Sequence, residues 1–265
     1  MPLIFQVFFF DIDGTLVSTG GAGRSAMDKA FREVHGVEGA LGQVSMAGRV
    51  DPAIYREAVD RFGFEPAPAA FQSAYFRHLG GELTRFGPLG RLLPGVDELL
   101  RHLAGLPEVM IGLLTGNWRR GAFLKLEHFG VSGYFDFGAF GDDADDRNAL
   151  PAVAIARFEK RARERLAAGV RYHVIGDTPS DIQCARVGRC RSIGVATGEF
   201  SLAELARHHP DLLLPDFTDL PAFCRAVGLA APLPAAAPLL PSRRAPMVAG
   251  GPMAGPSSLG SEVPE

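Results

Sequence analysis

Five short apolar runs along the chain predict buried parallel strands. They occupy residues 7–11, 109–116, 134–140, 172–177 and 191–198. Each run is continuously apolar rather than alternating, as in strands that are covered on both faces. Segments with the helical period of apolar residues lie between them, at residues 95–106, 117–130, 149–169 and 180–188. This alternation predicts a doubly wound α/β fold built on a parallel sheet.

Residues 18–91 depart from this pattern, because strand-like runs disappear and helical patterns replace them. The helical patterns lie at about residues 23–35, 52–62 and 67–86. Asp51 followed by Pro52 predicts a helix start, with Asp51 as the N-cap and proline in the first helical position. We therefore expect a smaller α-helical domain, inserted into an α/β core of residues 1–17 and 92–229. Such an insertion would cover the carboxyl ends of the strands, where open α/β sheets bind ligands.

The last segment, residues 230–265, has a different composition. Proline, alanine, glycine and serine dominate it, and it contains no aromatic residue. Such a segment buries too little apolar surface to offset the entropy of its chain, so its composition predicts a disordered tail.

The overall composition is that of a globular protein and narrows the possible partners. Apolar residues make up 47% of the 265 positions and charged residues 22%, which is usual for a domain with a proper core. The net charge of -3 gives no reason to expect binding to nucleic acid or to a membrane. No apolar run approaches the roughly 20 residues that span a bilayer. Cys184, Cys190 and Cys224 form no CxxC pair, which favours reduced thiols and a cytoplasmic location.

Polar residues follow three of the predicted strands. They are Asp11, Asp13, Gly14 and Thr15; Thr115, Gly116 and Asn117; and Asp177, Thr178, Ser180 and Asp181. Because crossover helices bring the carboxyl ends of parallel strands to one edge of the sheet, we expect these side chains to lie close together. Removing a carboxylate from water costs several kcal/mol unless a cation or hydrogen-bond donors compensate it. The pattern therefore favours a metal and catalytic site over a set of ordinary turn aspartates.

Three motifs in this order resemble those of the haloacid dehalogenase superfamily, specifically its phosphatase-type members. They are "DIDGT" at residues 11–15, "LLTGN" at 113–117 and "GDTPSD" at 176–181. The helical insertion after the first motif is similar to the small α-helical cap of this family. The resemblance covers roughly residues 5–225. It implies an Mg²⁺-dependent phosphomonoester hydrolase that acts on a small phosphorylated metabolite, similar to phosphoglycolate phosphatases.

The resemblance also implies roles for the aspartates. Asp11 would be the nucleophile and form an aspartyl-phosphate. Asp11 and Asp177 would bind Mg²⁺ through their carboxylates, Asp13 through its backbone carbonyl, and Asp181 through a water molecule. The side chain of Asp13 would then be the general acid and base. Thr115 and backbone N–H groups near Gly14 and Asn117 would bind the phosphoryl oxygens.

The family's remaining motif supplies a cation, and this chain has two candidates for it. The family usually has a lysine just before the helix that leads to the fourth strand, and here Arg147 lies in that region. We prefer Arg147 for this role, with a salt bridge to Asp145 or Asp146 as its structural alternative. Lys125 is the other possible cation, unless it is an exposed helix lysine. Arg49, in a glycine-containing turn of the cap, is a candidate substrate contact.

Two other functions remain open at this point. A sugar-phosphate mutase of the β-phosphoglucomutase type would share all of these motifs. A non-catalytic module that binds phosphate or metal could use the same fold, although the presence of both Asp11 and Asp13 argues for catalysis. The oligomeric state is not predicted.

Overall fold

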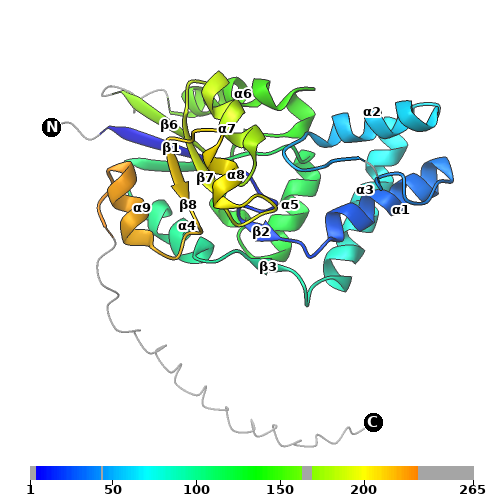
Figure 1. Cartoon of the computed structure of the whole chain (residues 1–265), viewed down its shortest axis with the longest axis horizontal. Coiled ribbons are helices and arrows are strands. Elements are labelled where there is room, and N and C mark those ends of the chain that lie inside the picture. The colour runs from blue at the N-terminus through cyan, green and yellow to red at the C-terminus, as the bar shows by residue number, and fades with distance from the viewer. Residues whose placement is uncertain (1–3, 43, 163–168, 232–265) are drawn as a thin grey trace, which may run out of the picture. The chain divides into compact units, whose positions relative to one another are not determined.

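The computed structural model describes residues 4–42, 44–162 and 169–231, and its centre is a six-stranded parallel sheet (Figure 1). The strand order is β5-β4-β1-β6-β7-β8, so the first strand of the chain is central. The strands are β1 (Phe5–Phe10), β4 (Val109–Leu114), β5 (Gly138–Ala139), β6 (Val170–Gly176), β7 (Arg191–Val195) and β8 (Leu212–Leu214). The core helices are α4 (Val96–Ala104), α5 (Arg119–His128), α6 (Leu150–Arg161), α7 (Pro179–Val187), α8 (Leu202–Ala206) and α9 (Leu220–Val227). The predicted α/β class is confirmed.

Helices cover both faces of the sheet, as the continuous apolar run of β1 predicts. Phe8 and Phe10 point to one face and pack in a cluster with residues of α4, α5 and α9. Val7 and Phe9 point to the other face and pack with α6 and α7. β1 is therefore wholly buried, and its carboxyl end is held in a fixed position in the middle of the sheet.

The strands at the edge of the sheet differ from the prediction. Of the run at residues 134–140, only β5 pairs with β4, and it follows a 3₁₀ turn (Ser132–Tyr134). Phe135 and Phe137 are buried, so the apolar residues of this run serve packing rather than strand pairing. β8 was not predicted, and neither was the short antiparallel pair of β2 (Val17–Ser18) and β3 (Arg91–Leu92). These segments are too short to show a period in the sequence.

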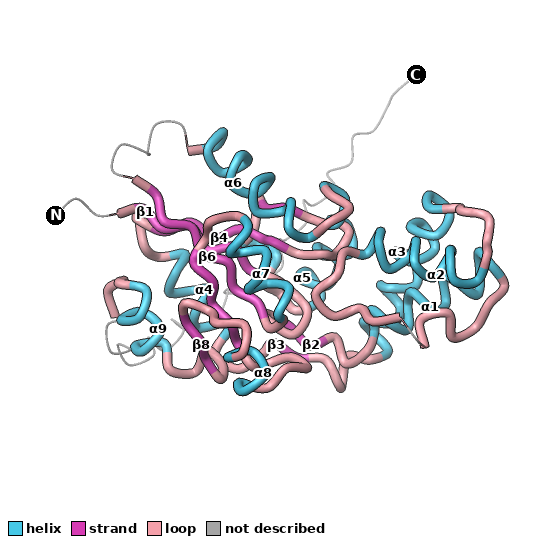
Figure 2. The backbone as a smooth tube through the Cα atoms, turned by 45° about the horizontal axis from the view of Figure 1, so that its top comes forward, coloured by secondary structure: helices cyan, strands magenta, loops and turns pink. Residues whose placement is uncertain are grey.

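The three helices predicted in residues 18–91 are present, as α1 (Ala22–His35), α2 (Asp51–Phe62) and α3 (Pro68–Arg85). Figure 2 shows them as a group beside the sheet. They have an apolar cluster of their own, which includes Met27, Phe31, Phe71 and Leu79. The chain enters this insertion through β2 and leaves it through β3, so the two connections are hydrogen-bonded to each other.

The prediction of Asp51 as a helix N-cap was wrong. Val50 is the N-cap residue and Asp51 is the first residue of α2, and no side chain caps this helix. The carboxylate of Asp51 accepts a hydrogen bond from the backbone of a different helix, described below. Short-range capping preferences could not show this, because the partner lies 67 residues away in the sequence.

Core and insertion belong to one compact unit, Met1–Pro232. Their division into two domains stays a prediction. Helix α6 ends at Arg161, and residues 163–168 of the longer predicted helix lie outside the described residues. The predicted tail also lies outside them from residue 232 onward. Within the described ranges, no helix has the length and apolar character needed to cross a lipid bilayer.

Candidate active site

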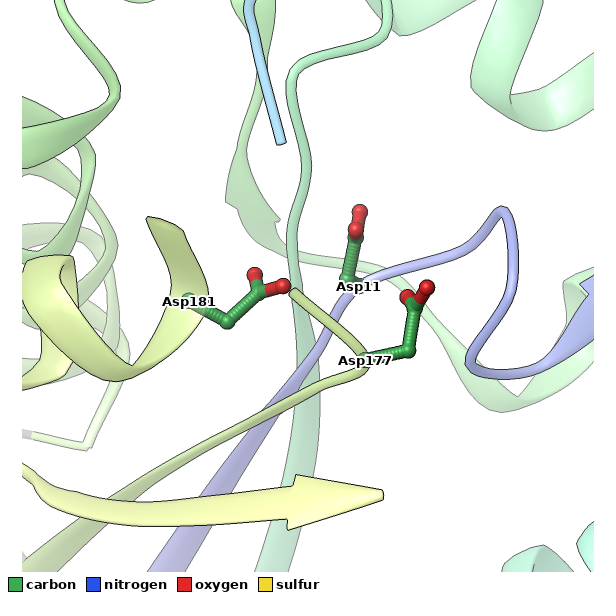
Figure 3. Close-up of side chains that lie close together, drawn as sticks. All are labelled: Asp11, Asp177 and Asp181. Carbon is green, nitrogen blue, oxygen red and sulfur yellow. The ribbon is translucent and has the colours of Figure 1, made fainter. Parts of the chain in front are cut away.

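The carboxyl ends of β1, β4 and β6 bring the predicted aspartates together. Phe10 of β1 is in register with Leu113 of β4 and with Ile175 of β6, so the residues that follow these strands converge at one edge. Figure 3 shows the side chains of Asp11, Asp177 and Asp181 close to one another. One carboxylate oxygen from each lies within 4.8 Å of the others, and all three residues are buried.

This group of carboxylates fits a divalent cation such as Mg²⁺. Its donors are hard oxygen atoms, which Mg²⁺ prefers. Asp177 has little freedom to move, because Thr15 Oγ1 donates a hydrogen bond to its Oδ1 over 2.9 Å. Two glycines also border it closely. A Cβ on Gly198 would lie 1.7 Å from Asp177 Oδ2, and one on Gly14 would lie 2.3 Å from the same atom.

The electrostatics of the group show an excess of negative charge. Burial raises the pKa of Asp11 to about 6, although the nearby Arg147 guanidinium lowers it in part. Burial, and then the charge of Asp181, raise the pKa of Asp177 well above its usual range. A cation bound among these carboxylates would stabilise their ionised forms.

Arg147 reaches the nucleophile candidate directly. It lies in the 3₁₀ turn before α6 (Arg147–Ala149) and is buried. Its Nη2 lies 3.0 Å from Asp11 Oδ2 and also forms an ion pair with Asp181. The alternative partners have other contacts: Asp145 pairs with Arg56, and Asp146 caps its own turn. The structural alternative for Arg147 was therefore wrong.

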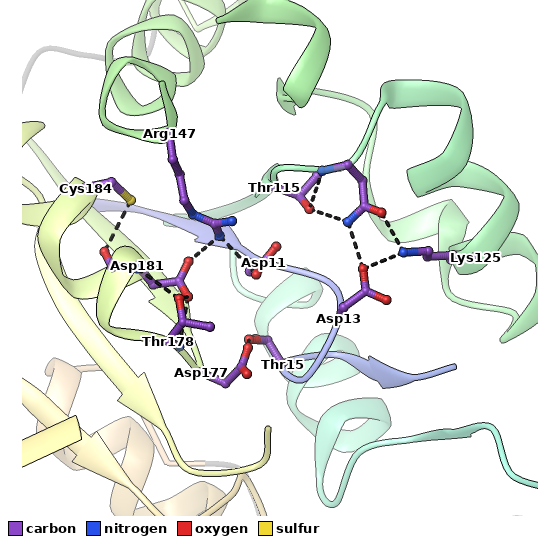
Figure 4. A network of polar contacts seen from close by, with 11 residues as sticks. Asp11, Asp13, Thr15, Thr115, Lys125, Arg147, Asp177, Thr178, Asp181 and Cys184 are labelled. Atoms are coloured by element: carbon purple, nitrogen blue, oxygen red, sulfur yellow. Dashed lines mark hydrogen bonds and ion pairs between the residues drawn. The ribbon is translucent and has the colours of Figure 1, made fainter. Parts of the chain in front are cut away.

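Lys125 belongs to a second polar network, drawn in Figure 4. Its Nζ lies 2.5 Å from Asp13 Oδ2 and 2.6 Å from Asn117 Oδ1. The Asn117 amide nitrogen donates hydrogen bonds to Asp13 Oδ2 over 2.9 Å and to Thr115 Oγ1 over 2.8 Å. Lys125 is buried, so the alternative of an exposed helix lysine was wrong. The two candidate cations thus hold different aspartates: Arg147 contacts Asp11, and Lys125 contacts Asp13.

Asp181 is fixed mainly by its own helix and by Arg147. Its carboxylate accepts hydrogen bonds from the backbone N–H of Thr178 over 3.0 Å and from the Thr178 hydroxyl over 2.6 Å. Gly176 is required beside it, because a Cβ there would lie 2.0 Å from the Asp181 carboxyl carbon. These contacts explain why "GDTPSD" has a glycine at its first position and a hydroxyl residue at its third.

A cavity of about 440 Å³ connects this edge of the sheet with the helical insertion. Core residues in its wall include Asp11, Asp13, Gly14, Asn117, Lys125, Arg147 and Asp177. Arg49 contributes from the insertion, where its guanidinium also pairs with Glu57 at 2.5 Å. The structure therefore brings most of the predicted residues around one space, whereas Thr115 and Asp181 are buried and do not line it.

Several residues that line this cavity were not indicated by the sequence, among them Arg24, Asp51, Tyr75, Thr197 and Gly198. Thr197 and Gly198 follow β7, whose carboxyl end reaches the same edge, so the topology could have indicated them. Burial raises the pKa of Asp51 to about 7, with the Lys125 charge lowering it in part. No local pattern indicates that Asp51 or Tyr75 faces the site.

The central strand of the α/β sheet ends in two aspartates, each in contact with a buried cation, so the site at this edge is built on carboxylates. The chain belongs to the haloacid dehalogenase-like hydrolase family, whose model matches residues 8–186. A second model, described as HAD-hydrolase-like, matches residues 156–220. The predicted family is confirmed.

Relatives narrow the class to phosphatase-type hydrolases. The chain is 29% identical over 221 residues to a phosphoglycolate phosphatase of Yersinia pestis, covering 80% of this chain and 89% of the relative. It is 25% identical over 236 residues to the Salmonella typhimurium phosphoglycolate phosphatase, with the same two coverages. A predicted phosphoglycolate phosphatase from Haemophilus somnus 129PT superposes with a TM-score of 0.60, at 21% identity, over 84% of this chain and 99% of that one.

A putative β-phosphoglucomutase from Bacteroides vulgatus has a similar TM-score of 0.59. The identity is 17%, and the match covers 85% of this chain and 89% of that one. Structural likeness at this level of identity shows a shared fold.

Proposed function

We propose that this protein is an Mg²⁺-dependent phosphomonoester hydrolase that works through an aspartyl-phosphate on Asp11. The observation that carries the proposal is the buried group of Asp11, Asp177 and Asp181 with Arg147 Nη2 at 3.0 Å from the Asp11 carboxylate. A carboxylate nucleophile needs no proton removed once ionised, so charge neutralisation and positioning carry most of the lowering of the barrier.

In this proposal, one oxygen of Asp11 attacks the phosphorus atom as the bond from phosphorus to the leaving alkoxide breaks. Asp11, Asp177, the Asp13 carbonyl and, through water, Asp181 would hold Mg²⁺, and the bound ion would supply positive charge next to the phosphoryl oxygens. Arg147 keeps the Asp11 carboxylate ionised and oriented. Thr115 and the backbone amides near Gly14 and Asn117 bind the phosphoryl oxygens.

Asp13 is the proposed general acid and base. Its side chain is 41% exposed on the cavity, while Lys125 and Asn117 hold one of its oxygens. It would donate a proton to the leaving alkoxide and later accept one from the water that hydrolyses the aspartyl-phosphate, so the group returns to its starting state after each cycle.

The proposed substrate is a small phosphorylated acid, with phosphoglycolate as the first candidate. The names of the relatives at 25–29% identity support this choice. The cavity of about 440 Å³ has room for a small metabolite, and its wall includes Arg24 and Arg49. A second anionic group of the substrate would compete with Glu57 for the Arg49 guanidinium. The contact of Arg49 with substrate remains a proposal.

A phosphate-release assay tests this function. The full chain would be incubated with Mg²⁺ and a panel that includes 2-phosphoglycolate and glucose 1-phosphate, with product analysis by ³¹P NMR. We expect released phosphate, and we expect none from Asp11→Asn, which keeps the side-chain volume but is a poor nucleophile. Isomerised sugar phosphate would indicate the mutase. Binding without turnover would indicate a non-catalytic module, and undiminished turnover by folded Asp11→Asn would refute the role of Asp11.

A further inference from the structure

Asp51, in the first turn of α2, forms two hydrogen bonds with the loop that follows β4. Its backbone N–H donates a hydrogen bond to the carbonyl oxygen of Gly116 over 2.7 Å. Its carboxylate Oδ2 accepts a hydrogen bond from the backbone N–H of Trp118 over 2.9 Å. The two bonds lie on either side of Asn117, so a residue of the helical insertion fixes the backbone before and after it.

The fit between this loop and the insertion is close. A Cβ on Gly116 would lie 1.9 Å from the carbonyl oxygen of Arg49, so only glycine lets the two backbones approach. On its other side, the Asn117 carbonyl accepts a hydrogen bond from Gly141 N over 2.8 Å. Asp51 is buried, and its carboxylate does not cap its own helix, whose N-cap residue is Val50. The carboxylate instead satisfies an amide at the start of α5, where backbone N–H groups lack helical partners.

Trp118 attaches the same loop to a second helix of the insertion. Its ring is buried among Phe71, Tyr75 and Phe76 of α3, with ring centroids 6.1, 5.4 and 6.2 Å away. Trp118 thus contacts α2 through its amide and α3 through its ring. The position of the loop therefore depends on the helical insertion being seated on the core.

The side chain of Asn117 contacts Asp13, the proposed general acid and base. Its side chain donates to Asp13 Oδ2 over 2.9 Å and accepts from Lys125 Nζ over 2.6 Å. We propose that Asp51 is a positioning residue, which orients Asp13 by fixing the backbone on both sides of Asn117. This inference rests on the proposed function, because it assumes that Asp13 transfers the proton.

A double-mutant cycle tests the inference. Asp51→Ala removes the acceptor for the Trp118 amide, whereas Asp51→Asn keeps an acceptor oxygen of the same reach. Asp142→Ala is the matched control, because Asp142 Oδ2 accepts from the next amide, Arg119 N, at an exposed place. Each variant would be assayed on an aryl and an alkyl phosphate, alone and combined with Asp13→Asn. Trp118 is the only tryptophan in the chain, so its fluorescence reports whether each variant keeps the folded site.

We expect Asp51→Ala to lower kcat on the alkyl phosphate by about 10- to 100-fold, as small displacements of a catalytic group do. The loss on the aryl phosphate should be smaller, because its leaving group needs less protonation. In the Asp13→Asn background, Asp51→Ala should lower kcat by less than about threefold, because the effects of substituting two interacting residues are not additive. Asp51→Asn should recover most of the activity, and Asp142→Ala should resemble the wild type.

Equal losses on both substrates, or full additivity with Asp13→Asn, would overturn the inference while leaving the phosphatase function intact. NMR provides a readout that needs no turnover. The side-chain amide resonances of Asn117 should shift in Asp51→Ala and stay in place in Asp51→Asn. If they stay in place in Asp51→Ala, Asp51 does not position Asn117, whatever the activity of the wild type.

Discussion

Replacement of Arg147 by methionine tests which cation serves the nucleophile. The substitution removes the guanidinium 3.0 Å from Asp11 Oδ2 and its ion pair with Asp181, and it keeps an unbranched apolar chain in the space. An aspartate beside an arginine has its pKa lowered by about 1–3 pH units. Burial already raises the pKa of Asp11 to about 6 in the presence of Arg147. In the variant, therefore, the Asp11 carboxyl becomes largely protonated near neutral pH.

A protonated carboxyl is a poor nucleophile, and the phosphoryl group also loses a stabilising charge. Loss of one group that stabilises the charge of the transition state lowers kcat by about 10²–10³-fold. We therefore expect kcat of Arg147→Met to decrease by at least that factor at pH 7. The sign of the pH effect follows from the same argument. Because Asp11 must be ionised to react, a higher pKa moves the acid limb of kcat/KM to higher pH, and part of the lost activity returns as the pH rises toward 9.

The assay is a set of pH–rate profiles for the wild type, Arg147→Met, Arg147→Lys and Lys125→Met at one Mg²⁺ concentration below saturation, because saturating Mg²⁺ would itself keep Asp11 ionised. Arg147→Lys should keep the acid limb near its original position, because the charge is retained. Lys125→Met should keep it too, since Lys125 contacts Asp13 rather than Asp11. An Arg147→Met enzyme within threefold of the wild type, or one with an unmoved acid limb, would refute the reasoning.

Three further predictions concern the acid–base group, a buried histidine and a tight glycine. Asp13→Asn should slow turnover by roughly 10²–10⁴-fold, more for alkyl than for aryl phosphates; equal losses in burst kinetics would exclude Asp13 as the acid. Burial lowers the pKa of His173 from 6.5 to about 3, so the unfolded chain binds a proton that the folded protein does not. His173 alone should therefore lower stability by about 2 kcal/mol from pH 7 to pH 5, so urea unfolding should show the wild type losing about that much relative to His173→Gln, whereas exposed His208→Gln should follow the wild type. Gly198→Ala should displace Asp177, whose Oδ2 would lie 1.7 Å from the new Cβ, and weaken Mg²⁺ binding in calorimetric titrations; unchanged affinity would contradict the role of Asp177 as a metal ligand.

The centre of the molecule could be predicted from the sequence because its physical causes are local or topological. A continuous apolar run such as residues 7–10 fits a strand that is covered on both faces, and β1 is that strand. Once the sheet is parallel, crossover connections place Asp11 and Asp177 at one edge without further information. The positions of Asp11, Thr115 and Asp177 follow from this rule alone.

Other parts depend on contacts that no local pattern contains. Lys125 lies on a helix whose sequence gives no reason to bury a lysine, and its burial depends on Asp13 and Asn117 lying opposite it. Asp51 has the sequence context of an N-cap, yet its carboxylate bonds to a backbone amide of another helix. β5 lies at the edge of the sheet and has only one partner strand, β4. The apolar run at residues 134–140 therefore pairs over two residues only, although its length would allow a longer strand.

The unbalanced charge at the site leads to a last prediction. Asp11, Asp177 and Asp181 are buried, and the one buried cation in contact with them among the described residues is Arg147. Their mutual repulsion destabilises the folded protein, and a divalent cation bound there would relieve it. Mg²⁺ should therefore raise Tm, because a ligand that binds only the folded state stabilises it by mass action.

The pH dependence of this rise separates a carboxylate site from unspecific salt effects. The carboxyls must lose their protons to bind the cation, and Asp11, with its pKa raised to about 6, is partly protonated at pH 5.5. The increase in Tm at a fixed Mg²⁺ concentration should thus be larger at pH 7.5 than at pH 5.5. Asp177→Asn should lose most of the increase at both pH values. Asp142→Asn, which removes an exposed carboxylate, should retain it. If the increase were equal at both pH values, or persisted in Asp177→Asn, the cation would be binding elsewhere than among these three aspartates.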